Sequence, residues 1–272
     1  MTMGTPILAF ASINIERSKH IPRVVTFLRA HAPEVVCLQE LVPEDIAPLC
    51  AQLGYAHHFY IPMCRFPEPG VPRTVGVGIL SRHAFASTEA VCYGGGGSGV
   101  DVLDRTSEEA RFRTNRYSVA LVGIRLGAET FNIATTHFPW TDNARTGDFQ
   151  RTACDALLRL LQDRSLVLAG DFNAPRGKEI FTRLATQWTD HIPPTQTTSI
   201  DPVLHRAGPL QLMVDGVFST DDYGVSGVTL HQGVSDHCAI TAMVGKRVRR
   251  GRVGAMGSDP YAPSPTEGGS RS

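Results

Sequence analysis

The sequence predicts one α/β domain in which short β-strands and α-helices are mixed along most of the chain. Apolar or β-branched runs of strand length recur between turn residues. Segments with helical spacing separate some of these runs, and 26 glycines and 18 prolines suit many turns. The 272 residues, 42% of them hydrophobic, can bury one large core. Mixed strands and helices argue against an all-β sandwich.

Eight segments are predicted as strands because they are short, apolar or β-branched, and bounded by turn-forming residues. They are Ile7–Ile13, Val35–Leu38, Val75–Leu80, Tyr117–Ile124, Phe131–Thr135, Leu166–Ala169, Leu210–Val214 and Ala239–Val244.

Three segments are predicted as helices. His20–Arg29 and Thr152–Leu161 repeat apolar residues every three or four positions, which places them on one face of a helix. A third helix is expected to open at Pro175, near its first turn, and to continue through Leu184.

Two segments fall outside this pattern. Gly94–Gly99 is glycine with one serine and predicts a flexible loop, which could be a mobile lid, an inert linker or an engineered insert. A basic cluster and then a Gly/Ser/Pro-rich stretch follow Gly245, typical of a disordered tail. We therefore expect an ordered domain over residues 1–245 and a tail over residues 246–272.

Composition limits the classes of function. The 26 basic and 26 acidic side chains cancel, so any binding of a polyanion must be local. None of the six cysteines forms a C-x-x-C pair, and Cys37 and Cys238 lie in apolar runs, which favours buried reduced thiols over a zinc site or disulfides. No signal peptide or membrane-spanning run is evident. The sequence predicts a soluble, cytoplasmic monomer.

The informative pattern is a polar residue directly after an apolar strand, repeated along the chain; Asn173 follows Asp171 by two residues, and Ser235-Asp236-His237 precedes the last strand. Each case alone has a simpler explanation as a turn, a helix cap, a solvated strand end or a hydrogen-bonded histidine. Carboxylate and amide oxygens together select Mg²⁺ or Mn²⁺, however, and strand ends are where α/β sheets place ligand sites. The residues concerned are Asn14, Glu40, His137, Asp171, Asn173, Asp215, Asp236 and His237.

These residues stand in motifs that resemble those of the endonuclease/exonuclease/phosphatase superfamily, the DNase-I-like fold. The resemblance spans about residues 5–245 and implies a four-layer α/β sandwich, with two packed, mostly antiparallel sheets flanked by helices. It also implies a metal-dependent phosphoric ester hydrolase with its site at one edge. The motifs are Ser12-Ile13-Asn14, Leu38-Gln39-Glu40, Thr136-His137, Gly170-Asp171-Phe172-Asn173, Val214-Asp215-Gly216-Val217-Phe218 and Ser235-Asp236-His237.

The resemblance implies a metal site for Mg²⁺ or Mn²⁺. Glu40 matches the principal metal ligand, and Asn14 matches the residue that supports the metal site. Asp236 would complete the acidic cluster and could provide a second metal position. The number of metal ions stays open.

The resemblance also implies roles in catalysis. Asp171 would orient and deprotonate the attacking water, Asn173 would bind the scissile phosphate, and His137 would donate to a non-bridging phosphate oxygen. Asp215 would pair with His237 and favour its charged form. The alternative, with His237 as general base and Asp215 as its orienter, stays open.

The substrate is less defined. Arg116 matches a phosphate-contacting arginine of some members, although Arg111 and Arg113 lie close by. Abasic-site enzymes of the superfamily carry a tyrosine motif where this chain has Thr136-His137, so abasic-site repair is disfavoured. Trp140 could stack on a base or pack under its loop. We expect a phosphodiesterase or nuclease acting on nucleic acid. The alternatives are a lipid or small-phosphoester enzyme and a non-catalytic binding protein.

Overall fold

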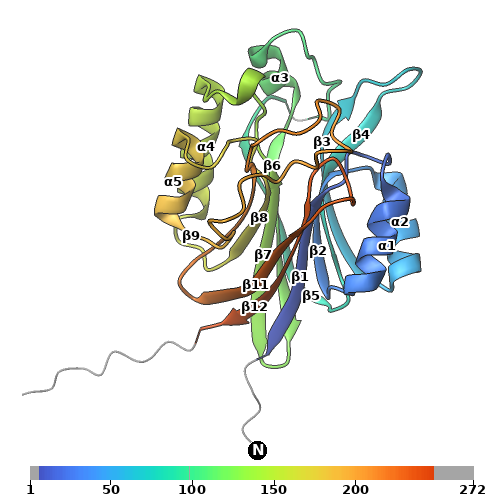
Figure 1. The fold of residues 1–272 in the computed structure, drawn as a ribbon, viewed down its shortest axis with the longest axis vertical. Coiled ribbons are helices and arrows are strands. Elements are labelled where there is room, and N and C mark those ends of the chain that lie inside the picture. Colours follow the sequence, from blue (N-terminus) through green and yellow to red (C-terminus); the bar gives the residue numbers. More distant parts are fainter. Residues whose placement is uncertain (1–5, 98, 248–272) are drawn as a thin grey trace, which may run out of the picture.

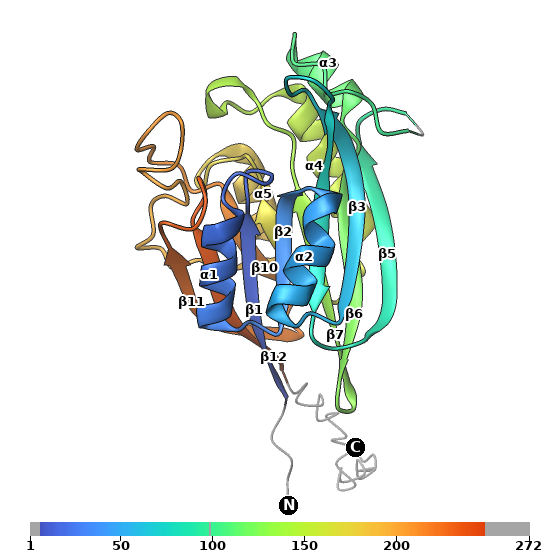
Figure 2. The same ribbon diagram turned by 90° about the vertical axis from the view of Figure 1, so that its right-hand side faces the viewer.

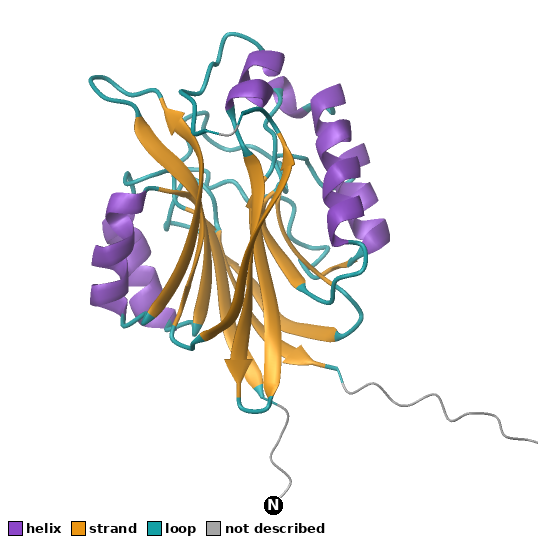
Figure 3. Cartoon of the chain, turned by 180° about the vertical axis from the view of Figure 1, so that it is seen from behind, coloured by secondary structure: helices purple, strands orange, loops and turns teal. Residues whose placement is uncertain are grey.

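Two six-stranded sheets pack face to face in the computed structural model, which describes residues 6–97 and 99–247. The strand order is β11-β12-β1-β2-β4-β3 in the first sheet and β5-β6-β7-β8-β10-β9 in the second. Helices cover the outer faces of both sheets, so the molecule has four layers (Figures 1 and 3). The predicted fold class is confirmed.

The first sheet consists of β1 (Ile7–Asn14), β2 (Val35–Leu41), β3 (His57–Phe66), β4 (Arg73–Ser81), β11 (Tyr223–His231) and β12 (Ala239–Lys246). The second consists of β5 (Phe85–Gly94), β6 (Tyr117–Leu126), β7 (Glu129–His137), β8 (Val167–Asp171), β9 (Thr189–Asp190) and β10 (Asp215–Ser219). The helices in the described ranges are α1 (Ile21–His31), α2 (Pro43–Leu53), α3 (Glu108–Thr114), α4 (Asp148–Leu161) and α5 (Glu179–Gln187), with a 3₁₀ turn at Asp142–Ala144.

Side chains on the central strands point alternately to the two faces of the sheet, and each face packs against a different layer. In β1, Leu8 and Phe10 belong to the core between the sheets, whereas Ala11 and Ile13 pack in the cluster formed with α1 and α2. Figure 2 shows these two helices side by side over the first sheet. Because both faces of the strand are buried, its sequence is a nearly continuous apolar run.

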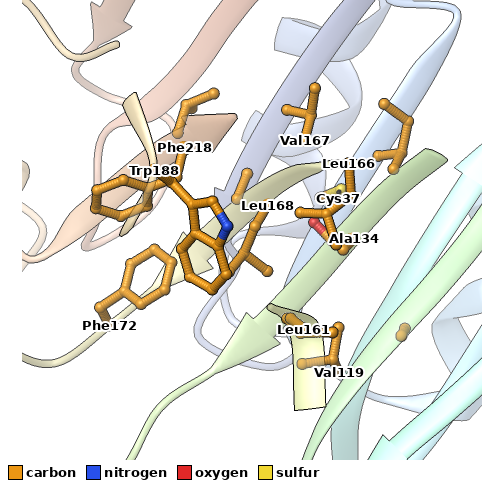
Figure 4. Packing of buried hydrophobic residues seen from close by; sticks show 14 of the residues in the cluster. Cys37, Val119, Ala134, Leu161, Leu166, Val167, Leu168, Phe172, Trp188 and Phe218 are labelled. Carbon is orange, nitrogen blue, oxygen red and sulfur yellow. Dashed lines mark hydrogen bonds between the residues drawn. The ribbon is translucent and has the colours of Figure 1, made fainter. Parts of the chain in front are cut away.

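The second sheet buries both faces in the same way. Figure 4 shows Cys37 of β2 close to Ala134 of β7, and its Sγ lies 4.0 Å from the Ala134 carbonyl oxygen. On the α5 side, the rings of Phe172 and Phe218 meet edge to face with centroids 5.1 Å apart. Trp188, at the end of α5, completes this apolar cluster.

Seven of the eight predicted strands are confirmed, and Leu210–Val214 is wrong. The strand begins at the next residue, Asp215. The backbone of the predicted segment bonds to loops instead of a ladder: Leu212 O accepts from Ser199 N, and Met213 O from Arg176 N. Within this segment Met213 and Val214 are buried, and burial does not require a sheet.

Two predicted helices are confirmed as α1 and α4, and the start of the third is wrong. α5 begins at Glu179, four residues after Pro175. Pro175 lies in a turn, where its carbonyl accepts a hydrogen bond from Lys178 N at 3.0 Å. Proline is favoured near the start of turns as well as of helices, so a proline in the sequence does not tell a turn from a helix start.

All six cysteines are free thiols, and the predicted burial of Cys37 and Cys238 is confirmed. No helix in the described part of the chain is long and apolar enough to cross a membrane. The predicted tail from residue 248 onward lies outside the described residues.

The glycine-rich segment after β5 passes very close to other backbone. A Cβ at Gly95 would lie 1.7 Å from the Asn115 carbonyl oxygen, and one at Gly96 would lie 2.1 Å from that of Arg113. Gly95 also has φ +87°, in the left-handed region. These two glycines are required by close packing between β5 and α3, which a linker would not need.

We expect Gly95→Ala to lower the free energy of unfolding by about 2 kcal/mol or more, since the methyl group would force the two backbones apart. The matched control is Gly99→Ala, because a Cβ at Gly99 has no atom within 4 Å. Urea denaturation measures both, and the control should stay within about 0.5 kcal/mol of wild type. Equal stabilities of the two variants would contradict the packing role.

Candidate active site

Strand ends from both sheets meet at one end of the sandwich, the upper end in Figure 1, opposite the start of β1. Asn14 and Glu40 lie at the end of β1 and β2 in the first sheet. His137 and Asp171 end β7 and β8, and the parallel register pairs them. Asp215 pairs with Asp171 in the antiparallel β8–β10 register. Asp215 is thus the first residue of a strand, which corrects its expected place after one.

Asp171 lies at the centre of this group, and its residue is only 1% exposed. Its Oδ2 accepts a hydrogen bond from Asn14 Nδ2 at 3.1 Å. The Nε2 atoms of His137 and His237 lie 3.5 and 3.8 Å from the same oxygen. Its Oδ1 accepts from the backbone N–H of Asn173 at 2.8 Å. Both oxygens of the carboxylate are therefore fixed in direction.

His237 forms a buried pair with Asp215. Its Nδ1 lies 2.7 Å from Asp215 Oδ2, while Ser199 Oγ accepts from the Asp215 backbone N–H at 3.1 Å. Burial alone would lower the pKa of His237, but the charges of Asp215 and then Asp171 outweigh it and hold the pKa well above its ordinary value. The two carboxylates therefore favour the protonated imidazole, and its Nε2 faces Asp171 Oδ2 at 3.8 Å.

A second acidic group lies beside the first. Ligand atoms of Glu16, His20 and Asp236 all fall within 4.8 Å of one another. Burial raises the pKa of Asp236 to about 6; the charges of Glu16 and Glu40 add to this rise, and His237 opposes it. Carboxylates that repel one another in this way provide the hard oxygen donors that a divalent cation takes. The residues present therefore fit the implied metal ion.

Two neighbours hold these carboxylates. His20 Nε2 lies 2.9 Å from Glu16 Oε2, and the His20 side chain is mostly buried. Arg17 donates to Glu40 Oε2 at 2.6 Å, and its guanidinium also lies over the Phe66 ring at 4.2 Å from the centroid. One oxygen of Glu40 is thus paired with a cation, while Oε1 lies 3.5 Å from the amide nitrogen of Asn14.

The backbone is strained where the functional side chains are presented. Glu16, Arg17, Glu40 and Asn173 all have positive φ, between +44° and +61°. Glu40 also lies at an irregularity in the β2–β4 pairing. Non-glycine residues in this region cost of order 1–3 kcal/mol each and persist only where the surroundings enforce them. The fold therefore fixes these residues at some cost in stability.

The structure brings together eight of the nine predicted site residues, and Arg116 precedes β6 at the same end of the sheet, where β6 and β7 pair through Val119 and Thr136. The Arg116 backbone N–H donates to Met63 O at 2.9 Å at the start of β6. Among the hydrogen bonds and ion pairs of residues 6–97 and 99–247, none joins its side chain to the cluster. Its contact with phosphate stays a prediction.

Sequence reasoning missed several residues of the site. Glu16 carries a usable signal, an acidic residue two positions after the strand-end Asn14. Ser199 and Asp201 carry none, because they lie in a long segment without strand or helix periodicity. Their roles come from side-chain hydrogen bonds to backbone that only the folded chain brings near.

Comparison with known proteins agrees with this arrangement. A model of the Endonuclease/Exonuclease/phosphatase family matches residues 11–237. The chain belongs to the endonuclease/exonuclease/phosphatase family. Members of this family are generally phosphoester hydrolases that use a divalent metal. No curated protein sequence matches the chain.

Solved structures of the endonuclease/exonuclease/phosphatase family share the fold at low sequence identity. A family protein from Beutenbergia cavernae is 18% identical with a TM-score of 0.67, covering 88% of this chain and 72% of its own. The human Nocturnin catalytic domain, with bound sulfate, is 17% identical with a TM-score of 0.67, covering 89% and 94%. ANGEL2, a 2′,3′-cyclic phosphatase in complex with adenosine-2′,3′-vanadate, is 14% identical with a TM-score of 0.65, covering 90% and 97%.

Asp201 fixes the loop that carries Asp236. Its Oδ1 accepts from the backbone N–H groups of Val203 and Leu204 at 2.9 and 2.8 Å, and its Oδ2 from Gly233 at 2.6 Å. Its own N–H donates to Asp236 O at 2.9 Å. Burial would raise the pKa of Asp201, but the three backbone donors outweigh it and lower the pKa.

We expect Asp201→Asn to lower the free energy of unfolding by about 1–3 kcal/mol at pH 7, because a buried acceptor is lost. A carboxyl with a lowered folded pKa stabilises above its unfolded pKa of about 3.9 and loses that effect as pH falls. The difference between variant and wild type should therefore shrink below about pH 4. Urea denaturation at several pH values tests this, with the exposed Asp163→Asn as control. A pH-independent difference would contradict the assignment to the carboxylate charge.

Proposed function

We propose that this protein is a divalent-metal-dependent phosphodiesterase that acts on nucleic acid by in-line attack of water, with the activity in residues 1–245. The observation that carries the proposal is the Asp171 carboxylate. It is almost completely buried, is fixed by Asn14 and Asn173, and has the imidazoles of His137 and His237 converging on one oxygen. A base placed between donors in this way suits attack on a phosphate.

Asp171 orients the water and takes its proton as the new P–O bond forms and the bond to the leaving oxygen breaks. Asn173 holds the scissile phosphate, since its amide nitrogen carries two hydrogens and, within residues 6–97 and 99–247, donates to Phe138 O alone, at 3.0 Å. His137 donates to a non-bridging oxygen as negative charge builds there.

His237 acts as a proton donor and electrostatic partner in this proposal. The raised pKa of His237 supports this role, because a general base must be neutral at working pH. Asp215 orients the ring through the 2.7 Å contact at Nδ1, which leaves Nε2 directed towards Asp171 and the phosphate. The alternative with His237 as base needs the opposite protonation state.

Glu40 and Asp236, with Glu16 beside them, would hold the Mg²⁺ or Mn²⁺ ion. When bound, such an ion neutralises charge on the phosphate oxygens and helps position the attacking group. Asn14 positions the two halves of the site, because its amide nitrogen lies 3.1 Å from Asp171 Oδ2 and 3.5 Å from Glu40 Oε1.

A substrate panel in Mg²⁺ and in Mn²⁺ tests the proposal: plasmid, single-stranded DNA, RNA, 5′-tyrosyl ends, sphingomyelin, phosphomonoesters and an aryl phosphodiester. The nucleic acids should be cleaved fastest. If sphingomyelin or phosphomonoesters are turned over faster, the substrate is a lipid or a small phosphoester and not nucleic acid. Metal-stimulated turnover of none of them would leave a binding protein on this scaffold.

Asp171→Asn should lower kcat on the order of 10²-fold or more while leaving the fold intact, because the amide cannot accept the proton from water. Steady-state kinetics and thermal unfolding measure the two effects. The exposed Asp163→Asn, at the end of α4, is the matched control and should keep the wild-type rate. A wild-type rate in the Asp171 variant would mean that another group activates the water.

Chelation of divalent ions should abolish turnover, and Mg²⁺ or Mn²⁺ should restore it. The same ions should raise the unfolding temperature, since binding to the native state alone stabilises by about 2.7 kcal/mol at 100 times Kd. Glu40→Gln should raise the ion concentration needed for both effects by about ten-fold or more, because a ligand charge is lost. If the ions do not change the unfolding temperature of wild type, the metal site is contradicted.

A further inference from the structure

Trp140 is an exposed aromatic side chain close to the site that the proposed mechanism does not use. The residue is 41% exposed, whereas Trp188, the other tryptophan of the chain, is 3% exposed. Trp140 follows His137 by three residues, in the segment that links β7 to α4. Three peptide units span at most about 11 Å between Cα atoms, so Trp140 lies at the same end of the sheet as His137, whose Nε2 is 3.5 Å from Asp171 Oδ2.

One face of the indole is held by Arg111. The guanidinium carbon lies 4.4 Å from the ring centroid, within the range of a cation–π contact. Arg111 is itself 7% exposed and donates to Asp142 Oδ1 at 3.2 Å, with Glu108 at 4.0 Å. The guanidinium that covers this face of the indole is therefore held in place on α3, which lies at the top of Figure 1.

The segment that carries Trp140 is tied to the catalytic loop. Gln150 is 1% exposed, and its Nε2 donates to Pro139 O at 2.7 Å and to Asn173 O at 3.2 Å. Asn173 Nδ2 donates to Phe138 O, and the Phe138 ring stacks on Tyr93 at 5.8 Å. Phe138 thus anchors the loop in the core, whereas Trp140 remains exposed above it.

We propose that Trp140 is a stacking platform for a nucleobase of the substrate, which makes it a specificity-determining residue. This inference rests on the proposed function, because it names the group attached to the scissile phosphate. A fixed aromatic ring backed by a cation and exposed beside a phosphate site suits a planar base, and stacking of this kind tolerates any base. The neutral net charge of the chain agrees, because local stacking would supply affinity that a long-range field does not.

Two substrates with the same leaving group separate this role from catalysis. Thymidine 5′-(p-nitrophenyl phosphate) carries a base, and methyl p-nitrophenyl phosphate does not. In the full-length protein, Trp140→Ala should lower the ratio of kcat/KM for the nucleoside ester over the methyl ester by about ten-fold, mainly through KM. Trp140→Phe should restore most of the ratio. Leu160→Ala, which removes an exposed apolar side chain from α4, should keep it. An unchanged ratio in Trp140→Ala would overturn the proposal.

Fluorescence provides a test that does not need turnover. In Trp188→Phe only Trp140 emits, and adenosine 5′-monophosphate should quench it saturably, whereas ribose 5-phosphate should not. In Trp140→Phe neither compound should quench the buried Trp188. Absence of quenching in Trp188→Phe, or a response to anionic vesicles in place of the nucleotide, would overturn the base platform. If wild type turns over neither these esters nor the nucleic acids of the substrate panel, the proposed function fails, whereas this titration still tests whether Trp140 binds a base.

Discussion

The hydrogen bond from Asn14 to Asp171 joins two residues that are 157 positions apart and belong to different sheets. The site exists only because the ends of β1 and β2 in one sheet face the ends of β7 and β8 in the other. Gln39 supports the same junction, since its Nε2 donates to Thr135 Oγ1 at 2.8 Å and to Ser12 Oγ at 3.2 Å. The packing of the two sheets is therefore the constraint on which the geometry of the site depends.

That junction gathers like charges in a largely buried region, and the fold compensates for them with paired cations. His237 pairs with Asp215 in one half of the site, and in the other half Arg17 pairs with Glu40 and Lys19 with Glu16. Asp236 has none of these partners and carries a pKa raised by burial to about 6. The positive φ angles at Glu40 and Asn173 add backbone strain in the same place. Stability is thus lowered locally where chemistry requires fixed groups.

The sequence predicted the parts of the fold in which a single pattern decides the structure. β1, β2, β4, β6, β7, β8 and β12 were recognisable because their residues are buried on one or both faces. β5 was missed because it is an edge strand with most side chains exposed, and β3 because histidines and a proline interrupt it. The Leu210–Val214 segment shows the converse error, since it is apolar but pairs with loops.

The candidate site was predictable to the extent that its residues stand in motifs at strand ends. Eight residues assembled as expected, although Asp215 begins a strand. Residues that act through folded contacts, such as Ser199 under Asp215 and Asp201 under the Asp236 loop, carried no local signal. The sequence also does not predict whether Trp140 is exposed. The folded chain places Arg111 against one face of its ring, and that contact has no local sequence signal.

The burial of the thiols has a practical consequence. Burial raises the pKa of Cys64, Cys154 and Cys238, so these sulfurs stay protonated and shielded from electrophiles at neutral pH. Cys92, in contrast, is exposed on the edge strand β5. Cys50 on α2 is half-buried, so once it is replaced Cys92 offers a selective attachment point for a spectroscopic label that follows distances to the site during substrate binding.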